Sequence, residues 1–155
     1  MCEYCGCQEI EVISELTAEH DRLRELGHDL AAAARQADLA GARPLAAAMR
    51  EVLTPHTTVE EQGLFPALAG EFGGPIDRLR QEHRTIDAGL AALAELDDPV
   101  TWPNWTKDVE DTLQELFEHI LKEQDGVFPA ALATLSATEW DAVAATRNNI
   151  PAHAT

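Results

Sequence analysis

HTTVEEQGLFPAL, residues 56–68, has a close copy in the same chain, HILKEQDGVFPAAL, which begins at residue 119. Both stretches contain His, then Glu four residues later, then Gly, an aliphatic residue, Phe and Pro at matching positions. Residue 119 lies 63 residues after residue 56, and every shared position keeps this offset. Because the spacing is constant, the two stretches are corresponding parts of a longer repeated unit.

The same offset relates residues upstream of both copies. Glu19 and His20 recur 63 positions later as Glu82 and His83, and the apolar neighbours follow, for example Leu16 as Leu79. The chain is therefore a twofold internal repeat. The two units span about residues 12–70 and 75–133.

The apolar pattern predicts helices throughout the chain. Leucines, isoleucines and histidines recur three or four positions apart, and no segment shows strand alternation. The expected helices span about residues 9–40, 44–69, 76–96 and 105–135, with connections at 41–44, 70–75 and 97–104. Short connections favour an all-α fold, an antiparallel up-down-up-down four-helix bundle.

This reading divides the chain into three parts. A cysteine-rich head is expected at residues 1–8, the bundle at 9–135 and a C-terminal tail at 136–155. Ser136 and Glu139 form a capping-box pattern, which predicts that the tail starts with a short helix.

The charge balance restricts the partners. Lysine and arginine number 11 and aspartate and glutamate 28, so the formal net charge is −17. Such a chain repels phosphate backbones and anionic membrane surfaces, so neither nucleic acid nor membrane is an expected partner. The sequence has no apolar run of about 20 residues and no basic and apolar N-terminal signal, and a cytoplasmic location is the expectation.

Six polar residues follow the apolar stripes and should meet inside the bundle. One histidine comes from each helix, and a glutamate four residues after the histidine comes from the second and fourth helices. Residues four apart are neighbours on a helix surface, so each His and Glu can reach a common point. The six candidate ligands are His20, His56, Glu60, His83, His119 and Glu123.

This donor set predicts two metal ions. A carboxylate can bridge two cations, so Glu60 and Glu123 would join a metal held by His20 and His56 to a second held by the other two histidines. Mixed imidazole and carboxylate ligation with open positions suits iron better than calcium or magnesium. One such histidine alone would be read as a hydrogen-bonded core residue. The alternative for all six is a bundle that holds zinc or no metal.

The pattern H, HxxxE, H, HxxxE resembles the hemerythrin-like family in its HHE form. The resemblance covers about residues 12–135 and implies a non-haem, oxygen-bridged di-iron centre at the six positions named above. Two departures set the chain apart from the oxygen carriers of that family. Asp87 follows His83 by four residues where the carriers have a further histidine, and the last pair, His119 and Glu123, is spaced by four residues instead of five. A more symmetric site argues against reversible oxygen carriage.

Three further residues are expected near the centre without serving as principal ligands. Asp87 is interpreted as solvent-exposed or in contact with a ligand, with a fifth oxygen ligand as the alternative. Glu61 is expected to be solvated. His28, which has no counterpart in the second repeat, is interpreted as a structural residue or as one that supports the site from outside, for example by a hydrogen bond near it.

The N-terminal head carries all three cysteines, Cys2, Cys5 and Cys7, in the pattern CxxCxC. A disulfide framework spread through the fold is therefore excluded, and metal or redox chemistry is favoured over a terminus with incidental thiols.

The functional hypothesis is a di-iron protein that binds and reduces a small oxidant, hydrogen peroxide or dioxygen, with the head cysteines as thiol reductant. The alternative is a protein without catalytic turnover: a nitric oxide or iron sensor, or an iron donor that repairs iron centres. A protein electron donor or iron acceptor is a compatible partner for either.

Overall fold

The computed structural model describes residues 10–151. The α-helices are α1 Glu11–Arg35, α2 Leu39–Val59, α3 Phe65–Ala94, α4 Trp105–Lys122, α5 Phe128–Thr134 and α6 Ala137–Asn148. Two π-helical segments, η2 Glu60–Leu64 and η4 Glu123–Val127, follow α2 and α4, and a 3-10 helix, η3, spans Pro99–Thr101. The described residues contain no strand, so the all-α expectation is confirmed.

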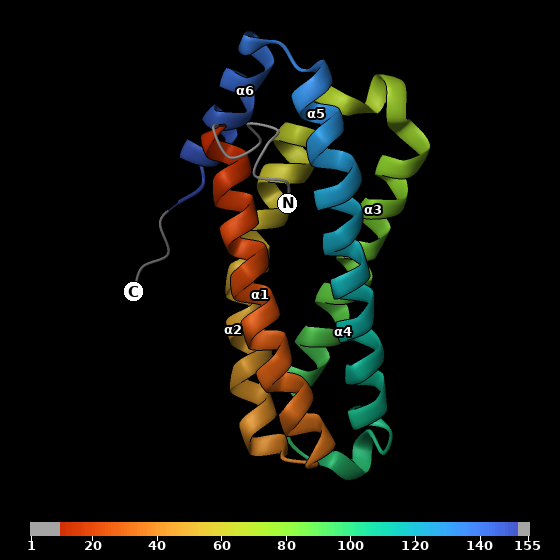
Figure 1. The fold of residues 1–155 in the computed structure, drawn as a ribbon. Helices are drawn as coiled ribbons and strands as arrows, with labels where there is room; N and C mark the ends of the chain where they lie inside the picture. Colours follow the sequence, from red (N-terminus) through yellow and green to blue (C-terminus); the bar gives the residue numbers. More distant parts are fainter. Residues whose placement is uncertain (1–9, 152–155) are drawn as a thin grey trace.

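The helices form four antiparallel rods (Figure 1). The first rod is α1, and the second is α2 with η2 and the first two turns of α3. The rest of α3 forms the third rod, and α4, η4 and α5 form the fourth. Helix α6 lies against the end of the first two rods (Figure 1). This is the expected up-down-up-down bundle with a short C-terminal helix, and Ser136 and Glu139 form the predicted capping box.

The first connection differs from the prediction. It lies at residues 36–38, not at 41–44, because Asp38 caps α2 by accepting a hydrogen bond from the Gly41 backbone N–H at 3.0 Å. Ala37 makes the turn with φ 52°, a left-handed conformation.

At the predicted break, residues 70–75, the chain turns from the second rod into the third (Figure 1). The bounds of α3 include both helical stretches, which meet at a sharp kink where Phe72 leaves helical geometry, at φ −122° and ψ 30°. Pro75 lies in the first turn after the kink, where its missing N–H has no helical partner to lose.

Both π-helical segments lie at the same place in the two repeats. In each, the backbone N–H of the Phe that follows bonds to the carbonyl of the Glu five residues earlier, from Phe65 to Glu60 and from Phe128 to Glu123. A proline comes next, and its ring clashes with a regular helical carbonyl four residues back. The widened turn relieves this clash, and π-turns often accompany functional sites.

The core consists of two apolar clusters. One, with Leu23, Met49 and Leu116 fully buried or nearly so, fills the half of the bundle near the 36–38 connection. The other, with Phe65 and Phe128 fully buried, fills the half near α5 and α6. None of the helices within residues 10–151 combines the length and the apolar character that crossing a bilayer requires.

Helix α6 packs tightly on the first repeat only. A Cβ built at Gly63 would lie 3.2 Å from Thr146 Oγ1 and 3.3 Å from Val143 Cγ1, both on α6. The repeat counterpart Gly126 has no such neighbour within 4 Å.

We expect Gly63→Leu to lower the free energy of unfolding by about 1–3 kcal/mol, because the side chain must displace α6. The matched variant Gly126→Leu enters open space and should change it by less than about 1 kcal/mol. Urea unfolding followed by circular dichroism measures both. Equal losses in the two variants would contradict this packing of α6.

Candidate metal centre

The six residues singled out in the sequence meet between the two apolar clusters. All are buried; the most exposed, His83, has 6% of its surface accessible, and Glu60 and Glu123 have none. His20 Nε2 lies 3.1 Å from His56 Nε2, and His83 Nε2 lies 3.0 Å from His119 Nε2.

These residues form two overlapping clusters. The first consists of His20 and His56 with the two glutamates, and the second of His83 and His119 with the same two glutamates. In each cluster the candidate ligand atoms lie within 4.8 Å of one another. The pairing of histidines is the one expected from the repeat, and shared carboxylates can bridge two cations.

The carboxylate oxygens test whether a metal fits here. Both oxygens of Glu60 and Oε1 of Glu123 are buried without a hydrogen-bond partner. They nevertheless lie close to imidazole nitrogens: Glu60 Oε1 is 3.1 Å from His56 Nε2, and Oε2 is 3.2 Å from His83 Nε2. A buried carboxylate without a donor costs several kcal/mol. Nitrogen and oxygen lone pairs directed at a common point are what a cation requires, so the donor set fits a metal.

The repeated LFPA and VFPA segments cover the centre. The Phe128 ring stacks on His20 with centroids 5.5 Å apart, and the Phe65 ring stacks on His83 at 5.6 Å. Both phenylalanines are fully buried. They orient two imidazoles and keep water away from one side of the centre.

In three of the four histidines, a carboxylate outside the centre contacts Nδ1, the ring nitrogen that faces away from the centre. His56 Nδ1 lies 2.7 Å from Glu19 Oε2, and His119 Nδ1 lies 2.8 Å from Glu82 Oε2. The third carboxylate is Glu61, whose Oε1 lies 2.7 Å from His83 Nδ1. Such contacts leave the Nδ1 proton on the far side of the ring and direct the Nε2 lone pair to the centre.

Sequence reasoning did not assign these outer carboxylates. Glu61 was expected to be solvated, but it packs beside the ligands because the π-turn places it between α2 and α3. Glu19 and Glu82 recur directly before a histidine in both repeats, and this recurrence was the signal that could have identified them. A contact between different helices is not visible in the spacing of either helix alone.

Two of the outer carboxylates form ion pairs with basic side chains. Arg147 of α6 contacts Glu19 through Nη1 at 2.5 Å, and Lys122 contacts Glu82 at 2.5 Å. Although burial alone would raise the pKa of Glu19, His56 and Arg147 outweigh it and lower that pKa. The same balance, with Lys122 and His119, lowers the pKa of Glu82. Both carboxylates therefore stay ionised and can accept from an imidazole N–H.

His20 is the exception, and its Nδ1 is buried without a hydrogen-bond partner. By the repeat, the counterpart of Glu61 is Gln124, which could have served it. Instead the Gln124 amide oxygen accepts a hydrogen bond from Arg24 Nη2 at 2.7 Å. The two clusters therefore have the same kinds of candidate ligand, two histidines and the two shared glutamates, but different surroundings.

Three of the candidate ligands, His56, His83 and Glu123, have strongly shifted pKa values in the metal-free protein. Burial alone would lower the pKa of His83, but the nearby carboxylates of Glu123 and Glu60 outweigh it and raise the pKa to about 10. The pKa of His56 is likewise well above its usual value. Burial alone would raise the pKa of Glu123, but the imidazoles of His119, His20 and His56 hold it well below its usual value. Protons and a metal cation therefore compete for the same atoms.

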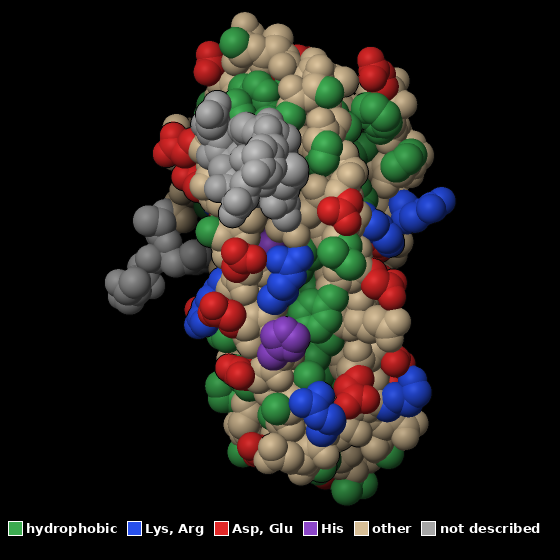
Figure 2. Space-filling model, viewed as in Figure 1, with side chains coloured by type: hydrophobic (Ala, Val, Ile, Leu, Met, Phe, Trp, Pro, Cys, Tyr) green, Lys and Arg blue, Asp and Glu red, His purple; other side chains and the backbone are tan. Residues whose placement is uncertain are grey.

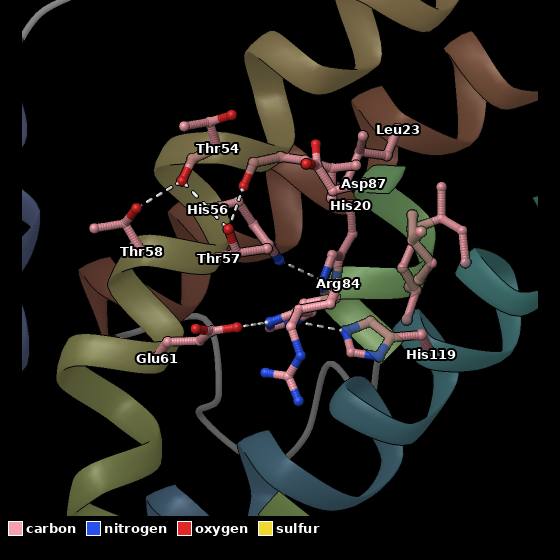
Figure 3. Close-up of a pocket in the computed structure, with 15 residues that line it drawn as sticks. His20, Leu23, Thr54, His56, Thr57, Thr58, Glu61, Arg84, Asp87 and His119 are labelled. Carbon is pink, nitrogen blue, oxygen red and sulfur yellow. Dashed lines mark hydrogen bonds and ion pairs between the residues drawn. The ribbon is translucent and has the colours of Figure 1, made fainter. Parts of the chain in front are cut away.

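A pocket of about 250 Å³ reaches the centre between α2 and α3 (Figure 3). All four histidines lie along it, together with threonines of α2 and Glu61. Thr54 and Arg84, which are exposed, lie at its outer end. The pocket therefore connects the buried imidazoles with the surface.

Asp87, His28 and the three cysteines were also singled out in the sequence. Asp87 lies outside both clusters and is paired with Arg50, with Nε to Oδ1 at 2.9 Å, so it is half-exposed and not a fifth ligand. His28 is exposed and its ring lies against Phe117, with centroids 5.6 Å apart, which agrees with the structural alternative for this residue. Cys2, Cys5 and Cys7 lie outside the described residues.

Comparison with known proteins gives a consistent match. A family model described as the hemerythrin HHE cation-binding domain matches residues 11–131. The iron-sulfur cluster repair protein YtfE of Yersinia pseudotuberculosis serotype IB (strain PB1/+) is 32% identical over 134 residues, covering 73% of this chain and 61% of that protein. The protein of the same name from Enterobacter sp. (strain 638) is 31% identical over 97 residues, covering 55% of this chain and 44% of that protein. The chain thus spans at most about three fifths of these relatives.

Replacing Glu61 by alanine removes the acceptor behind His83 and should weaken metal binding about 10–100-fold. The matched variant Gln124→Ala removes the repeat counterpart, which does not contact His20, and should leave affinity nearly unchanged. Chelator-competition titration with a divalent metal measures both. If Gln124→Ala weakens binding as much as Glu61→Ala, the outer contacts do not distinguish the two clusters.

The metal-free protein should be most stable between about pH 4.5 and 6.5. Raised histidine pKa values contribute stability that is present below the unfolded value of 6.5 and is lost as the pH rises toward about 10 for His83. The lowered pKa of Glu123 contributes stability that is lost as the pH falls below its ordinary value of 4.5. Urea unfolding across pH measures this, and the metal-loaded protein should keep its stability at higher pH because metal replaces the protons. A stability maximum of the metal-free protein above pH 8 would contradict the assignment.

Proposed function

This chain belongs to the hemerythrin HHE cation-binding family, and on that premise we propose that it holds two iron ions and donates iron in the repair of iron–sulfur centres. The single observation that carries the proposal is the pair of clusters that share Glu60 and Glu123. His20 and His56 would hold one iron, and His83 and His119 the other. The relatives named as iron-sulfur cluster repair proteins favour this function over the others considered.

Iron bound at these positions supplies a redox-active cation with coordination sites left over for an exogenous ligand. The protein's own residues set how it is bound. Glu19, Glu61 and Glu82 hold three imidazoles by Nδ1, so that Nε2 faces the metal. The stacked phenylalanines exclude water from one side.

The centre is suited to retain one iron and to exchange the other. His20 Nδ1 has no acceptor outside the centre. A hydrogen bond from the outer nitrogen of a ligating histidine typically contributes tenfold or more to metal affinity. The pocket between α2 and α3 gives the four histidines contact with the surface. A donor requires both a weaker position and a route out.

Reduction of hydrogen peroxide or dioxygen is the second candidate, and the same pocket favours it, because a small oxidant could reach all four histidines. Peroxide reduction to two waters consumes two electrons and two protons. Two head thiols, among Cys2, Cys5 and Cys7, could supply both by forming one disulfide. A cytoplasmic location, with a protein iron acceptor or electron donor, is part of either proposal.

The purified chain should contain two irons and transfer iron to an apo iron–sulfur protein under reducing conditions when inorganic sulfide is supplied. We expect the variant Glu60→Ala with Glu123→Ala to lose both irons, because no carboxylate then joins the clusters. Elemental analysis gives the iron content, and recovery of the acceptor's visible absorption gives the transfer. A chain that contains two irons and transfers none would overturn iron donation.

Peroxide consumption in the same preparation separates the two candidates. Iron transfer without turnover of peroxide supports donation, and thiol-dependent turnover without transfer supports reduction. Cys2→Ser, Cys5→Ser and Cys7→Ser together should spare iron content, and they should slow turnover only if the thiols are the reductant. Unchanged thiol-driven turnover would remove the cysteines from that mechanism.

A further inference from the structure

The two seams that flank the centre are related by the repeat but are built from different residues. Because α1 corresponds to α3 and α2 to α4, the seam between α2 and α3 corresponds to the seam between α4 and α1. Thr54 and Thr57 on α2 have Phe117 and Ile120 as their counterparts on α4, 63 positions later. Two small polar residues on one side are thus two large apolar residues on the other.

Beside the centre, the seam between α1 and α4 is closed by Phe117. A Cβ built at Gly27 would lie 2.8 Å from Phe117 Cζ, so the ring packs directly on the α1 backbone. A hollow of about 280 Å³ lies on this seam toward Arg35, but none of the four histidines lines it. Ile120 is fully buried and borders the pocket that reaches the histidines. Beside them, Arg24 and Gln124 bond across the seam at 2.7 Å. Figure 2, which views this face, shows hydrophobic side chains along the line between the two helices.

The seam between α2 and α3 holds the pocket (Figure 3). Its volume of about 250 Å³ has room for several water molecules. Thr54, Thr57 and Thr58 line one wall, and Thr54 leaves open the space that its counterpart Phe117 fills in the other seam.

The threonine hydroxyls present lone pairs to this space. Thr54 donates its hydroxyl proton to the Arg50 carbonyl at 2.9 Å, and Thr58 donates to the Thr54 carbonyl at 2.7 Å. Thr57 donates to the Leu53 carbonyl at 2.9 Å. With their protons engaged on the helix, the oxygens act mainly as acceptors, which suit a cation or its bound water.

Two charged residues line the pocket toward the surface. Asp87 is paired with Arg50, whereas Arg84 donates to the neutral amide of Gln81 at 2.8 Å and keeps its positive charge. Glu61, which also holds His83, is the carboxylate nearest the inner end. An incoming cation would therefore meet hydroxyl oxygens first and a carboxylate next to the histidines.

We propose that this threonine-lined pocket is the route by which hydrated ferrous iron enters and leaves the centre, and that the seam between α1 and α4 is closed to it. The inference deepens the proposed function and rests on it, because it assumes that the clusters bind iron. It assigns Thr54, Thr57 and Thr58 to iron exchange, a role separate from that of the ligands.

The test replaces threonines of the seam between α2 and α3 with the residues found at the corresponding positions of α4. The double variant Thr54→Phe with Thr57→Ile installs the residues of the other repeat. We expect iron content at equilibrium to stay at the unmodified level, and the rate of iron release to a ferrous chelator, and of uptake from a ferrous salt, to fall at least tenfold. Thr85→Ile is the matched control, because Thr85 also bonds to a helix carbonyl but is exposed on α3 outside the pocket. Its exchange rates should not change.

Slower exchange is the diagnostic direction, because damage to the fold would speed iron loss. If the double variant does not fold, the single variant Thr57→Ile decides the matter by the same rates. Unchanged or faster exchange in a folded, iron-loaded variant overturns the route. A failure of the unmodified chain to bind iron overturns the proposed function instead, so the two failures are distinguishable.

Discussion

Glu60 and Glu123 place two carboxylates at the middle of the bundle, where neither is accessible to water and three of the four oxygens lack a hydrogen-bond donor. Left uncompensated, such groups would cost several kcal/mol each. Four imidazoles surround them. In the metal-free state the nearby carboxylates raise the pKa values of His56, His83 and His119, so imidazolium charges offset the carboxylates. The rest of the structure depends on this buried charge, because each helix must supply a partner for it.

The residues that surround the buried carboxylates need polar partners of their own. An imidazole that faces the carboxylates with Nε2 needs an acceptor for Nδ1, and Glu19, Glu61 and Glu82 provide it. Two of these acceptors then need cations, which come from Lys122 and from Arg147 on α6. Helix α6 is therefore connected to the centre by an ion pair as well as by its packing on the π-turn. Helix α6, which lies outside the repeat, thus helps to orient His56 through Arg147 and Glu19.

The repeat gives symmetric ligands, and divergence outside the ligands gives the two sides different properties. Gln124 in place of a carboxylate leaves His20 without an acceptor, and threonines in place of Phe and Ile open one seam. Symmetric sites suit two like metal ions, whereas asymmetric surroundings suit exchange of one of them. This difference is why iron donation is favoured over a closed redox centre, in agreement with the repair proteins that the chain resembles over about three fifths of their length.

The sequence by itself determined the bundle, the repeat and the six buried residues of the centre, because helical spacing and a constant offset place residues on faces without knowledge of neighbouring helices. The break at residues 70–75 was predicted and contains the kink at Phe72, whereas the first connection lies at 36–38 and not at 41–44, since Gly41 and Pro44 are both tolerated in the first turns of α2. Only the tertiary structure decided which carboxylate holds which histidine, that Asp87 pairs with Arg50, and that one seam is open. These features depend on how side chains from different helices meet. The pattern along a single helix contains no information about the distance between side chains on two helices.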